Sequence, residues 1–256
     1  MTVCDVHAVV SGRPDGPAVV LSNSLGSTHR MWDAQLAELE RRFKVVRYDT
    51  RGHGGSPVPD GPYSIDDLTD DVVALLDRLD ITRAHVVGLS LGGMTAMRLA
   101  ARNPERVDRL AVLCTSAQLP PAGAWIERAK TVRANGAGAV AAAVVDRWFT
   151  PEYLAAHPEI RIEAEHMVAS TPAEGYAGCC EAIAKLDLRE DLSSIKAPTL
   201  AIAGADDPAT PPGMLRDIAD NIGGARVLVV PRSAHLANAE QPGTITGALI
   251  EHLEQS

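Results

Sequence analysis

The chain has 256 residues, of which 46% are hydrophobic, so it is long enough to bury a sizeable core within one α/β domain. Its formal net charge of −9 disfavours a general attraction to nucleic acid or to an anionic membrane surface. No apolar stretch is long enough to span a bilayer, and residues 1–7 lack the basic and apolar regions of a secretory signal. We therefore expect a cytoplasmic protein with neither nucleic acid nor membrane as a partner. The sequence leaves open whether it forms a homo-oligomer.

The cysteines give no sign of a disulfide framework or of a zinc site. The chain contains Cys4, Cys114, Cys179 and Cys180, with no Cys-x-x-Cys or His/Cys spacing. The adjacent pair, Cys179 and Cys180, is a poor disulfide because neighbouring residues seldom reach the required geometry. We expect all of them to be reduced, buried and small apolar side chains, and the sequence implies no metal and no organic cofactor.

Short apolar runs alternate with helix-like segments along the chain. The runs are Ala18–Ser24, Phe43–Asp49, Ala84–Ser90, Leu110–Thr115, Pro198–Gly204 and Arg226–Pro231. Most are almost continuously apolar, as is typical of strands that are covered on both faces. The clearest helix is Ser64–Leu79, which begins with a capping-box pattern at Ser64 and Asp67 and carries an apolar stripe. This alternation predicts an α/β fold with a mostly parallel, doubly wound sheet.

The alternation is interrupted once, from Gln118 to about Asp191. This segment shows several helix-like pieces, punctuated by prolines and glycines, and no strand pattern. Because open α/β sheets bind ligands at the carboxyl ends of their strands, we interpret the segment as a helical lid over those ends. The predicted domains are a core of residues 1–117 and 192–256 and a lid of residues 118–191.

The sharpest motif is Gly88-Leu89-Ser90-Leu91-Gly92, which follows an apolar run and precedes a helical pattern. A serine nucleophile on a strained turn between a strand and a helix needs small flanking residues, which this motif supplies. The start of the helix also offers backbone N–H groups to a developing oxyanion. The motif therefore predicts Ser90 as a nucleophile.

A serine hydroxyl is a weak nucleophile until a base accepts its proton. His235 lies in a loop directly after the run Val227–Val230, from where it can reach across to Ser90. The acid behind this base should lie between the two in the chain, and Gly204-Ala205-Asp206-Asp207 offers two candidates. The usual spacing, three residues after the glycine, favours Asp207, whereas Asp206 can cap the following turn. We predict a catalytic triad of Ser90, Asp207 and His235, with Asp206 as the alternative acid.

An oxyanion hole requires two backbone donors. The first should be the N–H of Leu91, which follows the nucleophile directly. The second should come from the loop Asn23–Ser27, where Gly26 lets the backbone pass close to the site. We expect the N–H of Leu25 to be that donor.

The segment Asp49-Thr50-Arg51-Gly52-His53-Gly54-Gly55-Ser56 resembles a loop found in many α/β-hydrolases, where its role is mainly structural. With the serine motif, the Gly-x-x-Asp and the late histidine, the resemblance covers nearly the whole chain and implies the α/β-hydrolase fold. The sequence departs from the pattern at Asn23-Ser24, where many relatives carry His-Gly.

A narrower resemblance concerns four further segments. Asn23–Gly26, Gly175–Ile183, Asp187–Arg189 and Ala234–Pro242 are similar to the corresponding parts of 3-oxoadipate enol-lactonases. The more specific features are the double cysteine and the tail His-Leu-x-Asn-x-Glu-Gln-Pro. The resemblance implies hydrolysis of a small anionic enol-lactone in the bacterial catabolism of protocatechuate and catechol.

The predicted lid carries a small surplus of positive charge. Between Ala117 and Thr150 the charged residues are Arg128, Lys130, Arg133, Arg147, Glu127 and Asp146. If the segment Trp125–Arg133 is helical, Arg133 shares an apolar face with Trp125, where a substrate carboxylate would be its partner. We take Arg133, Trp125 and Trp148 as candidate substrate-binding residues. An internal salt bridge or a snorkelling side chain remains the alternative for Arg133, and core packing for both tryptophans.

Other functions use the same sequence features less completely. A general carboxylesterase and a cofactor-free perhydrolase share the triad, so the shape and polarity of the lid decide among them. A non-catalytic ligand-binding module would not need the complete set of Ser90, Asp207 and His235. A nucleotide-binding α/β protein would need a Gly-x-Gly-x-x-Gly or Gly-x₄-Gly-Lys loop, which the sequence lacks.

Overall fold

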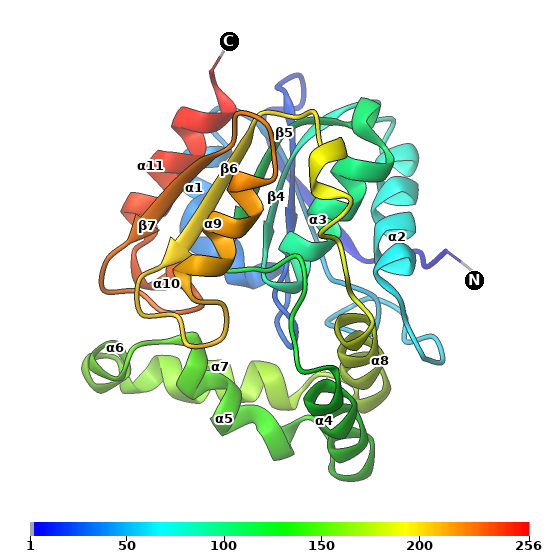
Figure 1. Ribbon diagram of the computed structural model, residues 1–256, viewed down its shortest axis with the longest axis vertical. Coiled ribbons are helices and arrows are strands. Elements are labelled where there is room, and N and C mark those ends of the chain that lie inside the picture. Colours follow the sequence, from blue (N-terminus) through cyan, green and yellow to red (C-terminus); the bar gives the residue numbers. More distant parts are fainter. Residues whose placement is uncertain (1–2, 256) are drawn as a thin grey trace.

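A computed structural model describes residues 3–255 and arranges them around a seven-stranded sheet (Figure 1). The strands are β1 (Ala8–Gly12), β2 (Ala18–Ser22), β3 (Lys44–Tyr48), β4 (Ala84–Leu89), β5 (Val107–Leu113), β6 (Thr199–Gly204) and β7 (Arg226–Val230). Their order in the sheet is β1-β3-β2-β4-β5-β6-β7, and β2 to β7 are parallel. The expected mostly parallel α/β sheet is therefore confirmed, with a strand at each of the six predicted apolar runs.

Strand β1 is the one strand that the sequence analysis did not predict. It pairs antiparallel with β3 at the edge of the sheet, from Ala8 opposite Tyr48 to Gly12 opposite Lys44. An edge strand is covered on fewer sides, and Val10 is 42% exposed. Because its apolar stretch is short, β1 lacks the continuous apolar pattern that marks the central strands.

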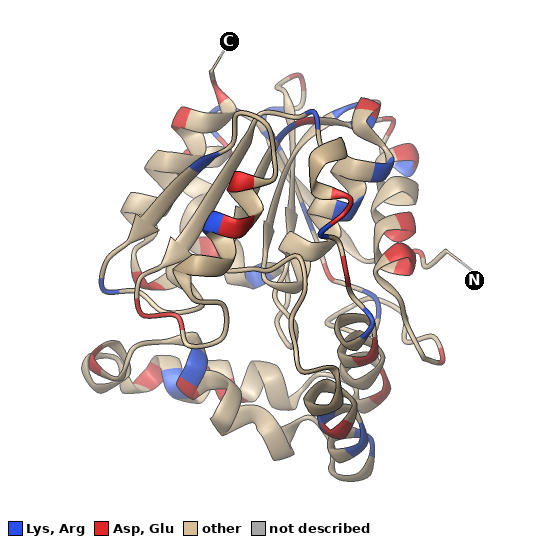
Figure 2. Cartoon of the chain, viewed as in Figure 1, with Lys and Arg blue, Asp and Glu red and all other residues tan. Residues whose placement is uncertain are grey.

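Helices cover both faces of the sheet. They are α1 (Asp33–Leu39), α2 (Ile65–Arg78), α3 (Leu91–Arg102), α9 (Pro212–Asp220), α10 (Ala237–Glu240) and α11 (Pro242–Leu253), with short 3₁₀ helices at His29–Trp32, Pro104–Arg106 and Leu192–Ser194. Helices α1 and α11 pack together on one face, whereas α2, α3 and α9 lie on the other (Figure 1). Strands β2, β4 and β6 contain no charged residue, and Figure 2 shows charges of both signs mainly over the outer helices. The hydrophobic core thus lies on both sides of the central strands.

Helix α2 forms where the sequence predicts it, and for the expected reason. The Ser64 hydroxyl accepts a hydrogen bond from the Asp67 N–H at 3.2 Å, and the Asp67 carboxylate accepts one from the Ser64 N–H at 2.8 Å. This reciprocal pair satisfies two N–H groups that have no partner within a helix.

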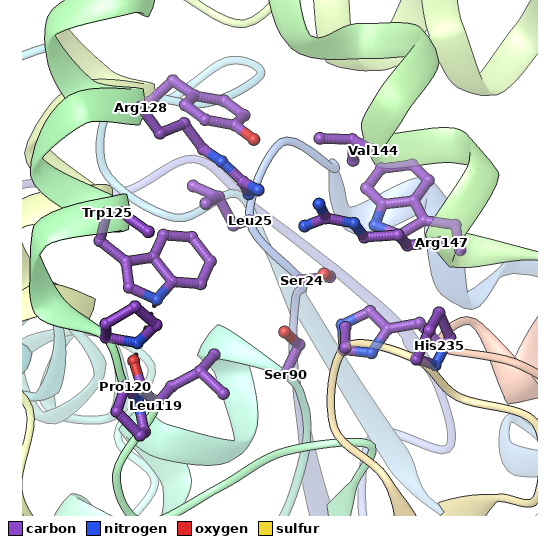
Figure 3. Close-up of a pocket in the computed structure, with 16 residues that line it drawn as sticks. Ser24, Leu25, Ser90, Leu119, Pro120, Trp125, Arg128, Val144, Arg147 and His235 are labelled. Carbon is purple, nitrogen blue, oxygen red and sulfur yellow. Dashed lines mark hydrogen bonds between the residues drawn. The ribbon is translucent and has the colours of Figure 1, made fainter.

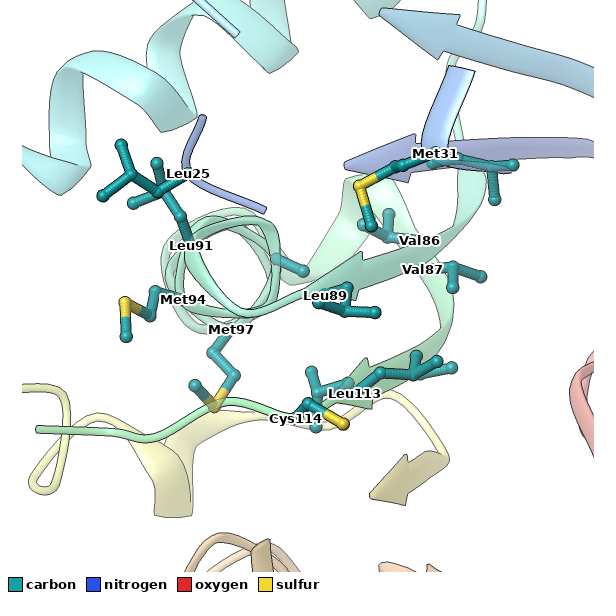
Figure 4. Packing of buried hydrophobic residues seen from close by; sticks show 14 of the residues in the cluster. Leu25, Met31, Val86, Val87, Leu89, Leu91, Met94, Met97, Leu113 and Cys114 are labelled. Atoms are coloured by element: carbon teal, nitrogen blue, oxygen red, sulfur yellow. The ribbon is translucent and has the colours of Figure 1, made fainter. Parts of the chain in front are cut away.

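Helix α3 packs beside β4, and its position determines that of Ser90. Figure 4 shows α3 almost end-on, with Leu89 on one side of the helix, Met94 on the opposite side and Met97 between them, on the side of Leu113. All four side chains are fully buried. The turn between β4 and α3 is therefore held by apolar contacts on both of its sides.

Between β5 and β6 the chain forms a layer of five helices, which we call the helical insert. They are α4 (Ala122–Asn135), α5 (Gly138–Trp148), α6 (Pro151–Ala156), α7 (Pro158–Ala169) and α8 (Ala173–Ala184). Helix α4 packs on α8 and α5 on α7, and the layer lies across the carboxyl ends of the parallel strands (Figure 1). Residues 118–191, all of which are described, contain no strand. Among the described residues, no helix is long and apolar enough to cross a lipid bilayer.

Candidate active site

Ser90 occupies a sharp turn between β4 and α3. Its backbone has φ 58° and ψ −117°, a conformation that side-chain-bearing residues rarely adopt. The turn is tight: a Cβ on Gly88 would lie 2.1 Å from the Gly92 carbonyl oxygen, and one on Gly92 would lie 2.2 Å from the Ser22 carbonyl oxygen. These close approaches are the physical reason for a glycine on each side of Ser90 in the motif.

Asp207 and His235 meet beside this turn. The His235 Nδ1 lies 2.8 Å from Asp207 Oδ2, and both residues are buried. The Asp207 carboxylate also accepts hydrogen bonds from the Thr210 hydroxyl at 2.7 Å and from the Ala209 N–H at 2.8 Å. With Nδ1–H donating to Asp207, the Nε2 of His235 is the free acceptor.

The alternative acid is not at this site. Asp206 is exposed to solvent, and its N–H donates to the Ser233 carbonyl at 3.0 Å. Burial by itself raises the pKa of Asp207, but the neighbouring His235 and the Thr210 hydrogen bonds outweigh it, so the pKa is lowered. Asp207 is therefore the carboxylate that can orient the imidazole and stabilise its protonated form.

Ser90 and His235 line one cavity of about 430 Å³ beneath the helical insert (Figure 3). Leu25, Trp125 and Trp148 are also in its wall, which includes no carboxylate residue. Among the hydrogen bonds of the described residues, none joins the Ser90 hydroxyl to His235 directly. Catalytic hydrogen bonds of this kind often tighten only when a substrate is bound.

The two expected oxyanion donors lie near Ser90. Leu91 is the first residue of α3, so its N–H precedes the hydrogen-bonded part of the helix. The N–H groups on either side of Leu25 are occupied, that of Ser24 by the Met31 sulfur at 3.2 Å and that of Gly26 by His53 Nε2 at 3.0 Å. No acceptor for the Leu25 N–H is found among the described residues.

The Asn23-Ser24 departure from the family pattern has a clear packing role. The Asn23 amide donates to the Tyr48 carbonyl at 2.6 Å and accepts from the Trp32 indole at 3.0 Å. Behind it, the His53 ring accepts from Gly26 and therefore donates through Nδ1 to the Arg51 carbonyl at 3.1 Å. These bonds hold the loop that carries Leu25 against the sheet.

The residues His7, His29 and Asp49 bring potential metal-ligand atoms within 4.8 Å of one another. Each imidazole faces the carboxylate, His7 at 3.2 Å and His29 at 3.0 Å. The same carboxylate also accepts the N–H groups of His29 and Gly55. Its four lone-pair positions are thus already used, and hydrogen bonding accounts for the cluster without an ion.

The expected position of Arg133 is wrong. Its guanidinium does not reach the cavity, because it forms ion pairs with Glu174 at 2.8 Å and Glu181 at 2.5 Å on helix α8. These carboxylates raise the pKa of Arg133 further above its ordinary value. The internal salt bridge, which the sequence left open as the alternative, is the arrangement found.

Arg128 and Arg147 take the place expected of Arg133. Both line the cavity, and Figure 3 shows their guanidinium groups directed into it from opposite sides. Neither forms an ion pair within the part of the chain that the structure describes, and the Arg128 guanidinium lies 4.6 Å from the centre of the Trp125 ring. The charge surplus of the segment was a signal for them, but it did not distinguish them from Arg133. Trp125 and Trp148 do line the cavity, as expected.

The segment Gly175–Ile183, including the double cysteine, packs helix α8 on the core. A Cβ on Gly175 would lie 2.0 Å from the Gly52 carbonyl oxygen, so α8 approaches the loop 49–56 backbone to backbone. Cys179 and Cys180 are fully buried free thiols, and burial raises the pKa of Cys180 to about 12. Cys4 and Cys114 are likewise buried and unpaired. The small residues of this segment therefore serve packing.

Comparisons with known proteins identify the family of the chain. The family model for the alpha/beta hydrolase fold matches residues 17–140 and 163–242. The 3-oxoadipate enol-lactonase 2 of Acinetobacter baylyi is 43% identical over 93% of this chain and 89% of its own length. The structure of the enol-lactonase from Burkholderia xenovorans LB400 superposes with a TM-score of 0.96 at 40% identity, covering 98% of this chain and 97% of that one. A thermophilic esterase from Thermogutta terrifontis superposes with a TM-score of 0.92 at 28% identity, covering 97% and 92%. The chain therefore belongs to the α/β-hydrolase fold family, and its expected resemblance to 3-oxoadipate enol-lactonases is confirmed.

Proposed function

We propose that the protein is a serine hydrolase that opens the ester bond of 3-oxoadipate enol-lactone to give 3-oxoadipate. The observation that carries the proposal is the cavity in which Ser90 and His235 face Arg128 and Arg147. This substrate combines a small ester ring with a carboxylate, so its two ends match the two sides of the cavity. The similarity to proteins named as enol-lactonases supports the same substrate and a role in aromatic catabolism.

In the first half of the reaction, His235 Nε2 accepts the proton of the Ser90 hydroxyl as the oxygen bonds to the lactone carbonyl carbon. The N–H groups of Leu25 and Leu91 stabilise the oxyanion, each contributing about 3 kcal/mol. The bond between the carbonyl carbon and the ring oxygen then breaks, and the enol oxygen takes the proton from His235. An acyl group remains on Ser90, and its enol end tautomerises to the ketone, which prevents the ring from closing again.

In the second half, water gives a proton to His235 and its oxygen bonds to the acyl carbon. The bond to Ser90 breaks, the serine oxygen recovers the proton, and the diacid leaves. Asp207 stabilises the protonated imidazole in both halves, which fits its lowered pKa. No step of this scheme passes through a metal or an organic cofactor.

The walls of the cavity supply the selectivity. Arg128 and Arg147 have no carboxylate partner in the described protein, so a substrate carboxylate is the group that would pair with them. Trp125 and Trp148 provide apolar surface beside the small ring. A cavity of about 430 Å³ with this lining suits a small monoanion better than a long acyl chain.

The test supplies the purified protein with 3-oxoadipate enol-lactone and follows the loss of the enol-ester absorbance. Neutral aryl esters run beside it as the reference for a general carboxylesterase. We expect kcat/KM for the lactone to exceed that for the aryl esters by at least about 100-fold, because Arg128 and Arg147 each offer a charge-assisted contact worth about 10-fold. Faster turnover of the aryl esters would contradict the lactonase proposal and favour a general carboxylesterase.

A fluorophosphonate probe separates an enzyme from a non-catalytic binding module. Because the probe reacts only with an activated serine, we expect it to label Ser90 stoichiometrically. Intact protein with an unlabelled Ser90 would favour the binding module.

A further inference from the structure

Glu240 is a buried carboxylate between the loop that carries His235 and the helical insert. It is 7% exposed and pairs with no Lys or Arg among the described residues. Its Oε1 accepts hydrogen bonds from the Thr150 N–H at 2.7 Å and the Thr150 hydroxyl at 2.8 Å. Its Oε2 accepts one from the Ala234 N–H. One side chain thus joins two segments that lie far apart in the sequence.

Both segments belong to the candidate active site. Ala234 directly precedes His235, so the peptide plane between them determines the position of the His235 Cα, from which the imidazole side chain extends. Thr150 caps α6 and follows α5, which ends in the cavity residues Arg147 and Trp148. A further bond, from the Leu236 N–H to the Trp148 carbonyl at 2.8 Å, runs beside the Glu240 contacts.

The opposite side of the His235 loop is fixed by the sheet. The Asp206 N–H donates to the Ser233 carbonyl at 3.0 Å, and the Ala234 carbonyl lies against Gly204, where a Cβ would approach it to 2.2 Å. The loop that carries His235 is therefore held between β6 and the helical insert. On the side of the insert, the Glu240 side chain links the loop to Thr150.

The chemistry of the three donors explains why this side chain is a carboxylate. Two backbone N–H groups and one hydroxyl point at it, and an ionised carboxylate offers an acceptor on both oxygens. An amide has one acceptor oxygen and one donor nitrogen, so it can serve Thr150 or Ala234 but not both. A buried carboxylate without a cation is costly, and burial raises the pKa of Glu240. Retaining it there implies that both contacts matter.

We propose that Glu240 is a positioning residue that aligns His235 with Ser90 and couples that alignment to the helical insert. The inference rests on the proposed serine-hydrolase function, because it assigns Glu240 a role toward its base. It also gives a physical reason for the tail motif His-Leu-x-Asn-x-Glu-Gln-Pro, whose glutamate the triad does not use.

The test is Glu240→Gln, measured with the lactone beside a matched control, Glu105→Gln, whose side chain is exposed and has no hydrogen-bond or ion-pair partner among the described residues. Because a misplaced base slows chemistry more than it weakens binding, we expect Glu240→Gln to lower kcat about 10- to 100-fold with KM within about threefold of the wild type. The control should match the wild type in both. Circular dichroism and gel filtration establish that the variant is folded under the assay conditions.

A second pair of variants examines the contact with the insert. Thr150→Val removes one donor to Glu240, whereas Thr150→Ser keeps it, so we expect a kcat loss of about three- to tenfold in the first that the second restores. In the double variant with Glu240→Gln, the two losses should not multiply, because both break one network. Amide exchange at Ala234 or at Thr150, whichever N–H the glutamine amide can no longer accept, should accelerate at least about tenfold in Glu240→Gln.

The outcomes separate the two proposals. A wild-type protein that neither turns over the lactone or aryl esters nor reacts with the fluorophosphonate overturns the serine-hydrolase function, and the positioning role with it. An active wild type together with a folded Glu240→Gln variant of unchanged kcat overturns the positioning role alone. A kcat loss in Glu240→Gln that only matches its loss of folded protein does the same.

Discussion

Two regions meet at the cavity, and they hold their polar side chains in different ways. In the loops at the strand ends, Asp207 and His235 are buried and bonded to one another, and Asp207 also accepts hydrogen bonds from fixed backbone N–H groups. In the helical insert, Arg128 and Arg147 reach the same cavity from partly exposed positions with no ion-pair partner in the described protein.

The difference separates reaction chemistry from substrate selection. Groups that move protons must stay within hydrogen-bonding reach of one another, which requires buried and fully satisfied neighbours. Groups that capture a charged substrate need a free hydrogen-bonding face and keep it by remaining partly hydrated. Changes in the strand-end loops should therefore act mainly on kcat, and changes in the insert mainly on KM.

The largest effect should follow removal of the nucleophile. Ser90→Ala leaves no oxygen to attack the ester, so we expect kcat for the lactone to fall about 10⁶-fold while the fold persists. Steady-state turnover and fluorophosphonate labelling measure it. Retention of more than about 1% of the turnover would place the nucleophile elsewhere.

The two neighbouring aspartates test how local the strand-end effect is. Asp207→Asn should lower kcat about 10⁴-fold, because the amide favours the wrong tautomer of His235. Asp206→Asn is the matched control: Asp206 is exposed, and its contact to Ser233 uses its backbone, so its kcat should remain within about twofold of the wild type. The reverse order of effects would exchange their roles.

The arginines test the opposite side of the comparison. Arg128→Gln and Arg147→Gln should each raise KM for the anionic lactone about 10-fold, because each removes a charge-assisted contact. Neither should change KM for a neutral aryl ester by more than about twofold. The assay is a parallel measurement of both substrates.

Arg133→Gln is the control for this pair. Its guanidinium is paired with Glu174 and Glu181 outside the cavity, so the substitution should leave the ratio of the two KM values unchanged. A rise in KM specific to the lactone would return Arg133 to the substrate site.

The smallest expected effect is on stability and concerns a buried histidine beside the sheet. It tests the fold independently of the active site. His252 on α11 is buried, its Nε2 lies 3.0 Å from the Leu110 carbonyl, and burial lowers its pKa to about 4. The folded pKa lies below the usual 6.5, so between these values the unfolded chain binds more protons and stability falls as pH falls. We expect protonation of His252 in the unfolded chain to lower the free energy of unfolding by about 1–2 kcal/mol between pH 7 and pH 5.

Urea unfolding at both pH values measures this loss. His252→Gln cannot take up the proton, so the difference between the two pH values should shrink in the variant. Part of the pH dependence should remain in the variant, because the pKa of buried His53 is also lowered. An identical pH dependence in the variant and the wild type would assign the effect to other groups.

The residues whose positions local patterns predicted correctly lie in turns and loops directly after strands, where the backbone geometry limits which residues fit. Ser90 was predictable because a turn this tight requires Gly88 and Gly92, and the same constraint holds wherever this turn forms. The approach of Asp207 to His235 followed from two loops at the same edge of a parallel sheet. Their roles in catalysis remain predictions for the assays above.

The residues that sequence reasoning missed are those whose position depends on how the helices pack against one another. Helical spacing placed Arg133 beside Trp125, but only the packing of α4 on α8 brought Glu174 and Glu181 to it and left Arg128 at the cavity. Glu240 stood in a motif with no assigned role, because its partner Thr150 lies in the helical insert. Strand β1 was missed because an edge strand needs little apolar pattern.

By itself, the sequence determined the parallel sheet, the strained serine turn and the order of the three polar residues around it. Those features follow from backbone geometry and from the period of apolar residues, which act over a few positions. Only the tertiary structure decided which arginines reach the cavity, what holds the His235 loop and how the insert sits on the core. Such choices depend on pairings between distant segments, where charge and shape must match across a contact that no local pattern records.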